Sequence, residues 1–77
     1  MTSQVTMPQW SMGMSEGTIV KWHKQVGDRV TLDEPLAEVE AEKVTDDLLS
    51  PVEGTLVEII VPEGETVPIR TVLALVS

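Results

Sequence analysis

Lys43 stands where a covalent group could be attached to the chain. It follows the segment 37–42, in which small apolar residues alternate with glutamates, and β-prone residues resume at Val44 and Thr45. Such alternation predicts a strand with one polar and one apolar face, and residues 41–44 can form a type I β-turn. A lysine in that turn would project its amine into solvent, either as a nucleophile for modification or as an ordinary surface lysine.

Other side chains that could bind a metal ion or act as catalysts are few. His23 is the only histidine, and the sequence offers it no partner, so we interpret it as an ordinary strand residue. Glu38, Glu40 and Glu42 could together bind a cation, but the alternation favours a solvated strand face. The chain has no cysteine, which excludes disulfides and thiolate metal sites, so any redox-active sulfur must come from an added group.

The chain is strongly acidic, with a net charge of -8 over 77 residues. Nucleic-acid-binding domains need a basic surface, and anionic membranes attract basic segments, so we expect neither partner. No apolar run approaches the roughly 18–20 residues of a membrane span, and the N-terminus lacks the basic and apolar regions of a signal peptide. The acidic surface either keeps the domain soluble or steers it toward basic patches on partner proteins.

An internal repeat organises the chain. Residues 16–40 align with residues 53–77 at a constant offset of 37, without a gap, and nine of the 25 aligned positions are identical. The identical positions include Gly27 and Gly64, which mark turns because glycine accepts positive φ. We therefore expect residues 1–77 to form a single domain made of two copies of one supersecondary unit.

Each copy is predicted to consist of short strands and turns. Prolines recur too often for a long helix, and no window has the 3.6-residue apolar period of one. The β-prone segments predict strands near residues 4–8, 18–23, 29–32, 36–41, 44–49, 54–61, 66–68 and 72–76. Such short strands predict an all-β fold, a flattened barrel or sandwich of two four-stranded antiparallel sheets with internal pseudo-twofold symmetry. Its core must be aliphatic, because Trp10 and Trp22 are the only aromatic residues.

The repeat also predicts where the two ends of the barrel lie. The join between the copies falls near residues 41–43, and its symmetry mate is the pair of chain termini. A pseudo-twofold axis can place these at opposite ends, which would suit a carrier that is tethered at one end and presents its cargo at the other.

From Met7 to Val76 the chain resembles the lipoyl domains of 2-oxo acid dehydrogenase complexes. The motifs that carry the resemblance are Met7-Pro8 and segments 14–18, 26–30, 35–45, 50–56 and 62–67. They occur in the order and spacing of that family, with the central glycine turn before the attachment hairpin and the second half after it. The resemblance implies that Lys43 is the attachment site of a lipoyl group.

Two features depart from the pattern of that family. The family usually has Thr-Asp before the lysine, whereas this chain has Ala41 and Glu42, which keeps the negative charge. An acidic residue, Asp46, stands where an apolar one is usual. If Val44 and Leu48 point inward, Asp46 would also point inward, which is costly unless a bulge or an open sheet edge relieves it.

The resemblance further implies a non-catalytic carrier, a monomer in isolation, whose partners are the enzymes of such a complex. A lipoate-protein ligase or lipoyl transferase would attach lipoate to Lys43 and recognise the flanking Ala41, Glu42, Val44 and Thr45. The lipoyl arm would then visit a thiamine-diphosphate-dependent 2-oxo acid decarboxylase, the acyltransferase core with coenzyme A, and dihydrolipoyl dehydrogenase. Such complexes lie in the prokaryotic cytoplasm or the mitochondrial matrix.

A loop from Gln9 to Met14 should, by the same resemblance, lie beside the Lys43 turn. Trp10, Met12 and Met14 either contact the decarboxylase there or cover the end of the barrel.

Three other functions use a related fold. A biotin carrier domain also modifies a turn lysine, but its family flanks that lysine with methionines, whereas Lys43 lies between Glu42 and Val44. An unmodified barrel that serves as an interaction module needs no lysine at this turn. A separate carrier for another acyl or one-carbon pathway is the third alternative.

Overall fold

The chain folds into short β-strands joined by tight turns. The computed structural model describes residues 2–42 and 44–77, and in these residues it contains eight strands and no helix. The strands are β1 Ser3–Thr6, β2 Glu16–Trp22, β3 Arg29–Val30, β4 Pro35–Glu40, β5 Thr45–Leu49, β6 Gly54–Ile59, β7 Thr66–Pro68 and β8 Val72–Val76. Every strand predicted from the sequence is present, with ends within two residues of the prediction.

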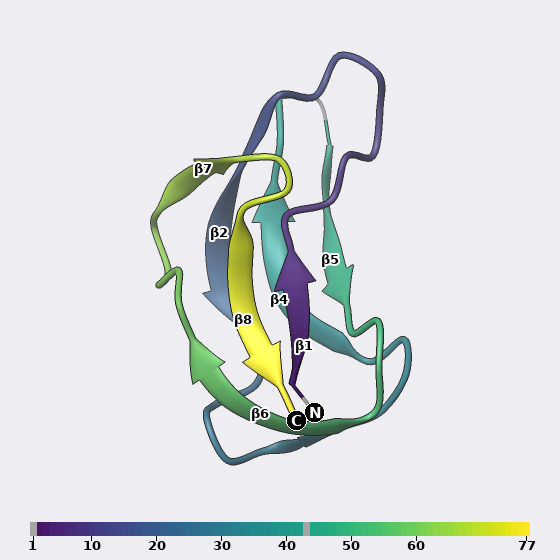
Figure 1. The fold of residues 1–77 in the computed structure, drawn as a ribbon. Helices are drawn as coiled ribbons and strands as arrows, with labels where there is room; N and C mark the ends of the chain where they lie inside the picture. Colours follow the sequence, from purple (N-terminus) through teal and green to yellow (C-terminus); the bar gives the residue numbers. More distant parts are fainter. Residues whose placement is uncertain (1, 43) are drawn as a thin grey trace.

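The strands form two four-stranded antiparallel sheets, with the orders β1-β8-β6-β3 and β5-β4-β2-β7. The two sheets curl around one another to give an elongated barrel (Figure 1). This confirms the predicted all-β class. No helix in the described residues is long and apolar enough to cross a membrane.

The two halves correspond strand by strand, as the repeat predicted. Adding 37 to residues of β2, β3 and β4 leads to β6, β7 and β8, and the two sheet orders become the same under this exchange. Hydrogen bonds between the halves repeat as well. The Ile19 N–H donates to the Glu65 carbonyl at 3.0 Å, and the Leu56 N–H, at the matching position, donates to the Asp28 carbonyl at 2.9 Å.

The core between the sheets is aliphatic apart from two methionines, in line with the composition. Ser50 is the one fully buried polar residue in the described part of the chain, and its hydroxyl is bonded to the Val52 carbonyl. The buried hydrophobic residues are Val5, Met7, Met14, Ile19, Val30, Leu36, Ala37, Val39, Leu48, Leu56, Val61, Leu73, Ala74 and Val76. Eight of these 14 belong to β2, β4, β6 or β8, the inner strands of the sheets.

The cost expected for Asp46 does not arise, because its side chain is solvated. Asp46 is exposed although Leu48, two residues later on the same strand, is buried. β5 is the outermost strand of its sheet, so no strand beyond it shields Asp46 from water. The Asp46 carboxylate accepts a hydrogen bond from the Asp47 N–H at 2.7 Å. The open edge that could relieve the cost is therefore present.

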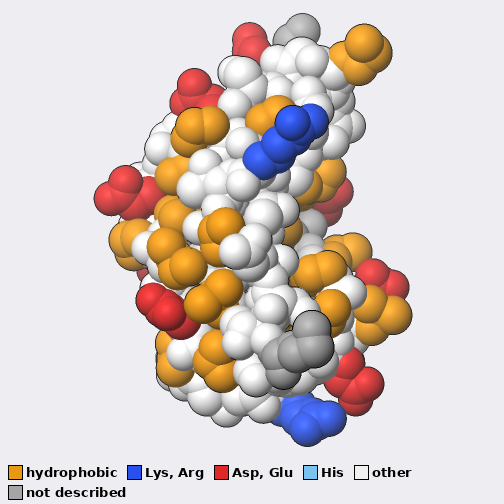
Figure 2. All heavy atoms as spheres, in the orientation of Figure 1, with side chains coloured by type: hydrophobic (Ala, Val, Ile, Leu, Met, Phe, Trp, Pro, Cys, Tyr) orange, Lys and Arg blue, Asp and Glu red, His pale blue; other side chains and the backbone are white. Residues whose placement is uncertain are grey.

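The end of β4 and the start of β5 lie at one end of the barrel, and both termini lie at the other (Figure 1). On the face seen in Figure 2, acidic side chains are distributed around the outline and hydrophobic ones lie between them. Lys and Arg side chains do not gather into a patch on this face, which agrees with the net charge of -8.

Candidate functional site

Strands β4 and β5 form the hairpin that the sequence predicted around position 43. Glu40 pairs with Thr45 at the last rung of the ladder. Beyond it, the Ala41 N–H donates to the Val44 carbonyl at 2.7 Å, and the Val44 N–H donates to the Ala41 carbonyl at 3.4 Å. The two strands are thus bonded up to Ala41 and Val44. The predicted attachment residue, Lys43, lies outside the described residues.

The residues that flank position 43 are accessible to a modifying enzyme. Glu42 and Thr45 are exposed, Ala41 is half-buried, and Val44 has a relative exposure of 40%. Their predicted role in recognition by a ligase stays a prediction.

The loop between β1 and β2 lies beside this hairpin, as the resemblance predicted. A pocket of about 320 Å³ separates the two, and its lining comes from both sides. Trp10, Ser11, Gly13 and Met14 come from the loop, and Ala41, Glu42 and Val44 come from the hairpin.

Hydrogen bonds within the loop fix its shape. The Gln9 side-chain amide donates to the Met14 carbonyl at 3.3 Å, and the Trp10 N–H donates to the Met14 sulfur at 3.4 Å. The Met14 N–H in turn donates to the Ser11 carbonyl at 3.1 Å. Gln9 was not among the residues predicted for the site. A lone polar residue next to Trp10 gives no signal in the sequence that it braces a loop.

The three apolar side chains predicted in this loop differ in exposure. Met14 is 7% exposed and belongs to the core, Trp10 is half-buried against that core, and Met12 is 99% exposed. Met14 and Trp10 therefore cover the end of the barrel. Contact of Trp10, Met12 or Met14 with a decarboxylase stays a prediction.

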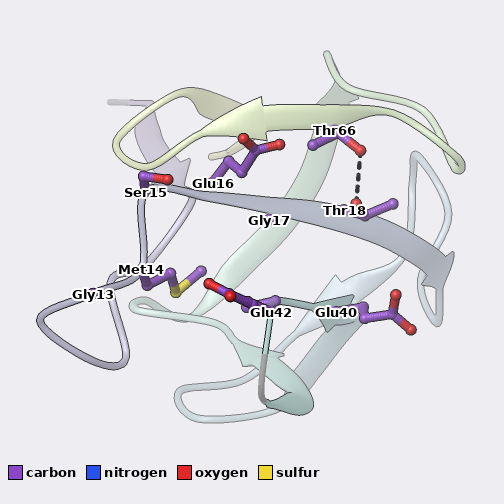
Figure 3. Close-up of a pocket in the computed structure, with 10 residues that line it drawn as sticks. Gly13, Met14, Ser15, Glu16, Gly17, Thr18, Glu40, Glu42 and Thr66 are labelled. Carbon is purple, nitrogen blue, oxygen red and sulfur yellow. Dashed lines mark hydrogen bonds between the residues drawn. The ribbon is translucent and has the colours of Figure 1, made fainter.

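A second pocket, of about 400 Å³, lies on another side of the same hairpin (Figure 3). Its lining includes three glutamates, Glu16, Glu40 and Glu42, and the hydroxyls of Thr18 and Thr66, which are hydrogen-bonded to each other at 2.7 Å. The two pockets adjoin, because Gly13, Met14, Ala41 and Glu42 line both. The pocket toward Trp10 and Val44 is the more apolar one, and the pocket toward Glu16 and Glu40 is the more acidic one.

The described residues contain no group of three His, Asp or Glu side chains that could hold a metal ion. The glutamates of β4 are half-buried or exposed, which fits a solvated strand face. His23 follows β2 and is partly exposed, and its Nε2 lies 3.4 Å from a carboxylate oxygen of Asp47.

The clearest electrostatic interaction lies away from the hairpin, just before the start of β4. The Lys24 ammonium and the Glu34 carboxylate are 2.8 Å apart. The hydrogen bond from Lys24, followed by one from the Thr31 N–H, lowers the pKa of Glu34 below its ordinary value of 4.5. The same bond to Glu34 raises the pKa of Lys24 above 10.5. This ion pair joins the β2–β3 loop to the β3–β4 loop and takes no part in the site.

Comparison with known proteins shows the family to which the chain is similar. The family model described as "Biotin-requiring enzyme", which covers biotin and lipoyl attachment domains, matches residues 3–76. The chain is 43% identical over its full length to the dihydrolipoyllysine-residue succinyltransferase component of the 2-oxoglutarate dehydrogenase complex of Bartonella vinsonii. Over 94% of its length it is 47% identical to the dihydrolipoyllysine-residue acetyltransferase component of the pyruvate dehydrogenase complex of Corynebacterium glutamicum. The chain spans 19% and 11% of these two relatives.

A solved structure agrees with this placement. The lipoyl domain of the 2-oxoglutarate dehydrogenase complex from Azotobacter vinelandii superposes with a TM-score of 0.76 at 30% identity. The match covers 96% of this chain and 94% of that domain. The chain therefore belongs to the biotin and lipoyl attachment family, and within that family it is a lipoyl domain like those of dihydrolipoyllysine acyltransferase components.

Proposed function

We propose that this domain carries lipoate in amide linkage to Lys43 and presents it as a swinging arm within a 2-oxo acid dehydrogenase complex. The observation that supports this most is the hairpin bonded up to Ala41 and Val44, at the end of the barrel opposite the termini. A chain that continues from either terminus would tether the domain at one end and leave the hairpin free to approach other enzymes.

The surroundings of the hairpin suit such a group. Glu42 and Thr45 are exposed and Val44 is partly so, which gives a ligase access to both sides of position 43. The chain has only two other lysines: Lys21, the last but one residue of β2, and Lys24, bonded to Glu34. Neither lies on a hairpin. Amide formation would remove one positive charge and change the net charge from -8 to -9.

When attached, the lipoyl group supplies a strained disulfide that takes up an acyl group and two electrons and passes the acyl group to coenzyme A. The domain itself contributes position. Its paired strands hold the attachment point, and its tether would keep the arm at roughly millimolar effective concentration near several active sites. We propose that the domain performs no catalytic step.

The proposed partners follow from the relatives. These relatives are components of 2-oxoglutarate and pyruvate dehydrogenase complexes, at similar identity to this chain. We therefore propose 2-oxo acids as the substrate class. The partners would be a thiamine-diphosphate-dependent decarboxylase, an acyltransferase core and dihydrolipoyl dehydrogenase, with a lipoate-protein ligase or lipoyl transferase for the attachment.

Mass spectrometry after incubation with a modifying enzyme tests the proposal. The domain is treated in parallel with lipoate-protein ligase and with biotin ligase, and intact and peptide masses are measured. A lipoyl mass on the peptide that contains Lys43 supports the proposal. A biotinyl mass supports a biotin carrier instead, and no modification by either enzyme supports an unmodified interaction module.

Three variants show whether the modification is specific to the hairpin. Lys43→Arg should abolish lipoylation, whereas Lys21→Arg and Lys24→Arg should leave it unchanged. Modification that persists in Lys43→Arg would move the attachment site to another lysine and overturn the proposal.

A further inference from the structure

The two pockets beside the hairpin differ in chemistry. The lining of the pocket between the hairpin and the loop is mostly apolar, with Glu42 as its single acidic residue among the described residues. The other lining residues are Trp10, Ser11, Gly13, Met14, Ala41 and Val44. The other pocket shares Met14, Ala41 and Glu42 with it, but adds Glu16, Glu40 and the hydroxyls of Thr18 and Thr66 in place of Trp10 and Val44. A neutral, sulfur-containing group and a charged group would therefore prefer different sides of the hairpin.

We propose that the pocket between the loop and the hairpin is a resting site for the dithiolane ring of the lipoyl arm. This inference depends on the proposed attachment at Lys43 and assigns a place to the arm when it is not visiting an enzyme. Both sequence neighbours of Lys43, Glu42 and Val44, line this pocket. An arm attached to the residue between them would be tethered near the pocket and held there at high local concentration.

The lining suits the chemistry of the arm. A dithiolane with a methylene chain is neutral and apolar, and sulfur makes favourable contacts with aromatic rings. Trp10 offers such a ring, and Met14 offers a polarizable thioether. The volume of about 320 Å³ lies at the lower end of the roughly 300–1,000 Å³ that is usual for small-molecule sites.

The second pocket does not suit the same ring. Placing an apolar group against Glu16 and Glu40, which line only this pocket, would remove water from two further carboxylates without giving them a new partner, which is unfavourable. The difference between the pockets selects one side of the hairpin for the arm.

The loop side of the pocket is formed before the arm docks. Gln9 holds the Met14 carbonyl at 3.3 Å, and Met14 is itself fixed in the core. Little loop ordering is then needed on docking, which favours binding. The methylene chain still loses rotational freedom when the ring docks. This loss of freedom opposes docking, so the arm can leave the pocket again, as a carrier that must release its arm requires.

Nuclear magnetic resonance on the lipoylated domain tests the inference directly. Full lipoylation of Lys43 is first confirmed by mass, so that a failure of the proposed function is recognised before the arm is examined. The indole N–H signal of Trp10 should shift on lipoylation and should show nuclear Overhauser contacts with dithiolane protons. The indole N–H of Trp22 donates to the Val61 carbonyl at 2.9 Å, outside this pocket, and serves as an internal control that should not shift.

A domain that is fully lipoylated but has an unchanged Trp10 signal and no contacts to the ring would overturn the resting-site inference and leave the proposed function intact. Octanoylation of Lys43 gives a matched arm without sulfur. It should produce a smaller shift of Trp10 than lipoylation does, because only the dithiolane supplies sulfur–aromatic contacts.

A second measurement follows the exposure of the ring. The rate at which a water-soluble phosphine reduces the attached dithiolane should rise about two- to tenfold in Trp10→Ala, the range that loss of a sulfur–aromatic contact allows. Met12→Ala, on the same loop but outside the lining, and Thr18→Ala, in the acidic pocket, should leave the rate unchanged. Equal rates in Trp10→Ala and the unsubstituted domain, with both folded by their melting curves, would contradict the inference. The magnetic resonance test needs no variant and decides the matter if Trp10→Ala does not fold.

Discussion

Gly27 and Gly64, at equivalent positions of the two repeats, share a left-handed backbone conformation with φ of 98° and 88°. A β-carbon added to either glycine would meet no atom within 4 Å, so space does not explain their presence. The conformation does, because L side chains clash with their own backbone at such φ values. We expect Gly27→Ala and Gly64→Ala each to lower the free energy of unfolding by about 1–2 kcal/mol, measured by urea denaturation.

Gly13 provides the matched control for this prediction. A β-carbon added to Gly13 would also meet no atom within 4 Å, but the φ of Gly13 lies outside the left-handed range. Gly13→Ala should leave the stability unchanged or raise it by up to about 1 kcal/mol, because alanine restricts the unfolded chain. A loss in Gly13→Ala as large as that in Gly27→Ala would show that backbone conformation is not the cause.

The repeat made most of the fold predictable. Local signals predicted the strands and the two glycine turns, and the offset of 37 predicted the symmetry. The same offset relates Asp33 to Arg70, which have φ of 65° and 72°, and neither was predicted. Their conformation is held by contacts from distant parts of the chain: the Asp33 N–H donates to the Ser50 carbonyl and the Arg70 N–H to the Met7 carbonyl, both at 2.8 Å. Arginine has no intrinsic preference for such a conformation, so the residue type at position 70 gave no signal in the sequence.

Some features of the candidate site were predictable from the sequence, and others were not. The alternation along β4 and the β-prone residues that resume at Val44 predicted the hairpin, because both patterns are local in the sequence. The sequence left open whether Asp46 is buried or solvated, because this depends on β5 being the outermost strand, which is a property of the whole sheet. The pocket between Trp10 and Val44 joins residues far apart in the sequence, and only the resemblance to a family indicated that the loop and the hairpin are neighbours.

Gly17 aligns with Gly54 of the second repeat, and at both positions there is no room for a β-carbon. A β-carbon at Gly17 would lie 2.8 Å from the Met7 sulfur and 3.1 Å from a methyl group of Val39, and both side chains are buried. We expect Gly17→Ala to destabilise the domain by about 1–3 kcal/mol, as overpacking of a core does. Urea denaturation measures the loss.

A double-mutant cycle tests whether Met7 is the obstacle. Met7→Ala removes the sulfur, so the cost of Gly17→Ala should be smaller in a Met7→Ala background than in the unsubstituted domain. Strictly additive losses would show that contact with Met7 does not explain the glycine.

The Lys24–Glu34 pair predicts how stability depends on pH. The pKa of Glu34 is lowered by its hydrogen bond from Lys24, so its contribution is present above about pH 4.5 and is lost as the pH falls through the lowered pKa. The pKa of Lys24 is raised, so its contribution is present below about pH 10.5 and is lost as the pH rises through the raised pKa. Glu34→Gln should therefore be less stable than the unsubstituted domain at neutral pH, and the difference should shrink in acid. Urea midpoints measured from neutral to acidic pH check this.

The Arg29–Glu53 pair supplies a control for that experiment. Its charged atoms are 3.3 Å apart, and its side chains are 71% and 63% exposed, so water screens it more than it screens the Lys24–Glu34 pair. Glu53→Gln should lower the urea midpoint at neutral pH less than Glu34→Gln does. A Glu34→Gln domain with an unchanged midpoint across this range would contradict the proposed role of the pair.

Moving the lysine by one position should abolish its modification. Successive residues of a strand send their side chains to opposite faces, and Val44 both lines the apolar pocket and is bonded to Ala41 through its backbone. Exchanging Glu42 with Lys43, or Lys43 with Val44, keeps composition and net charge while placing the amine elsewhere on the hairpin. We expect lipoate-protein ligase to leave both variants unmodified by intact mass, although both retain the melting behaviour of the barrel, which is anchored by core residues away from the turn. Efficient lipoylation of either exchange variant would mean that the ligase accepts any accessible lysine at this end of the barrel, and the position of Lys43 would then have no special role.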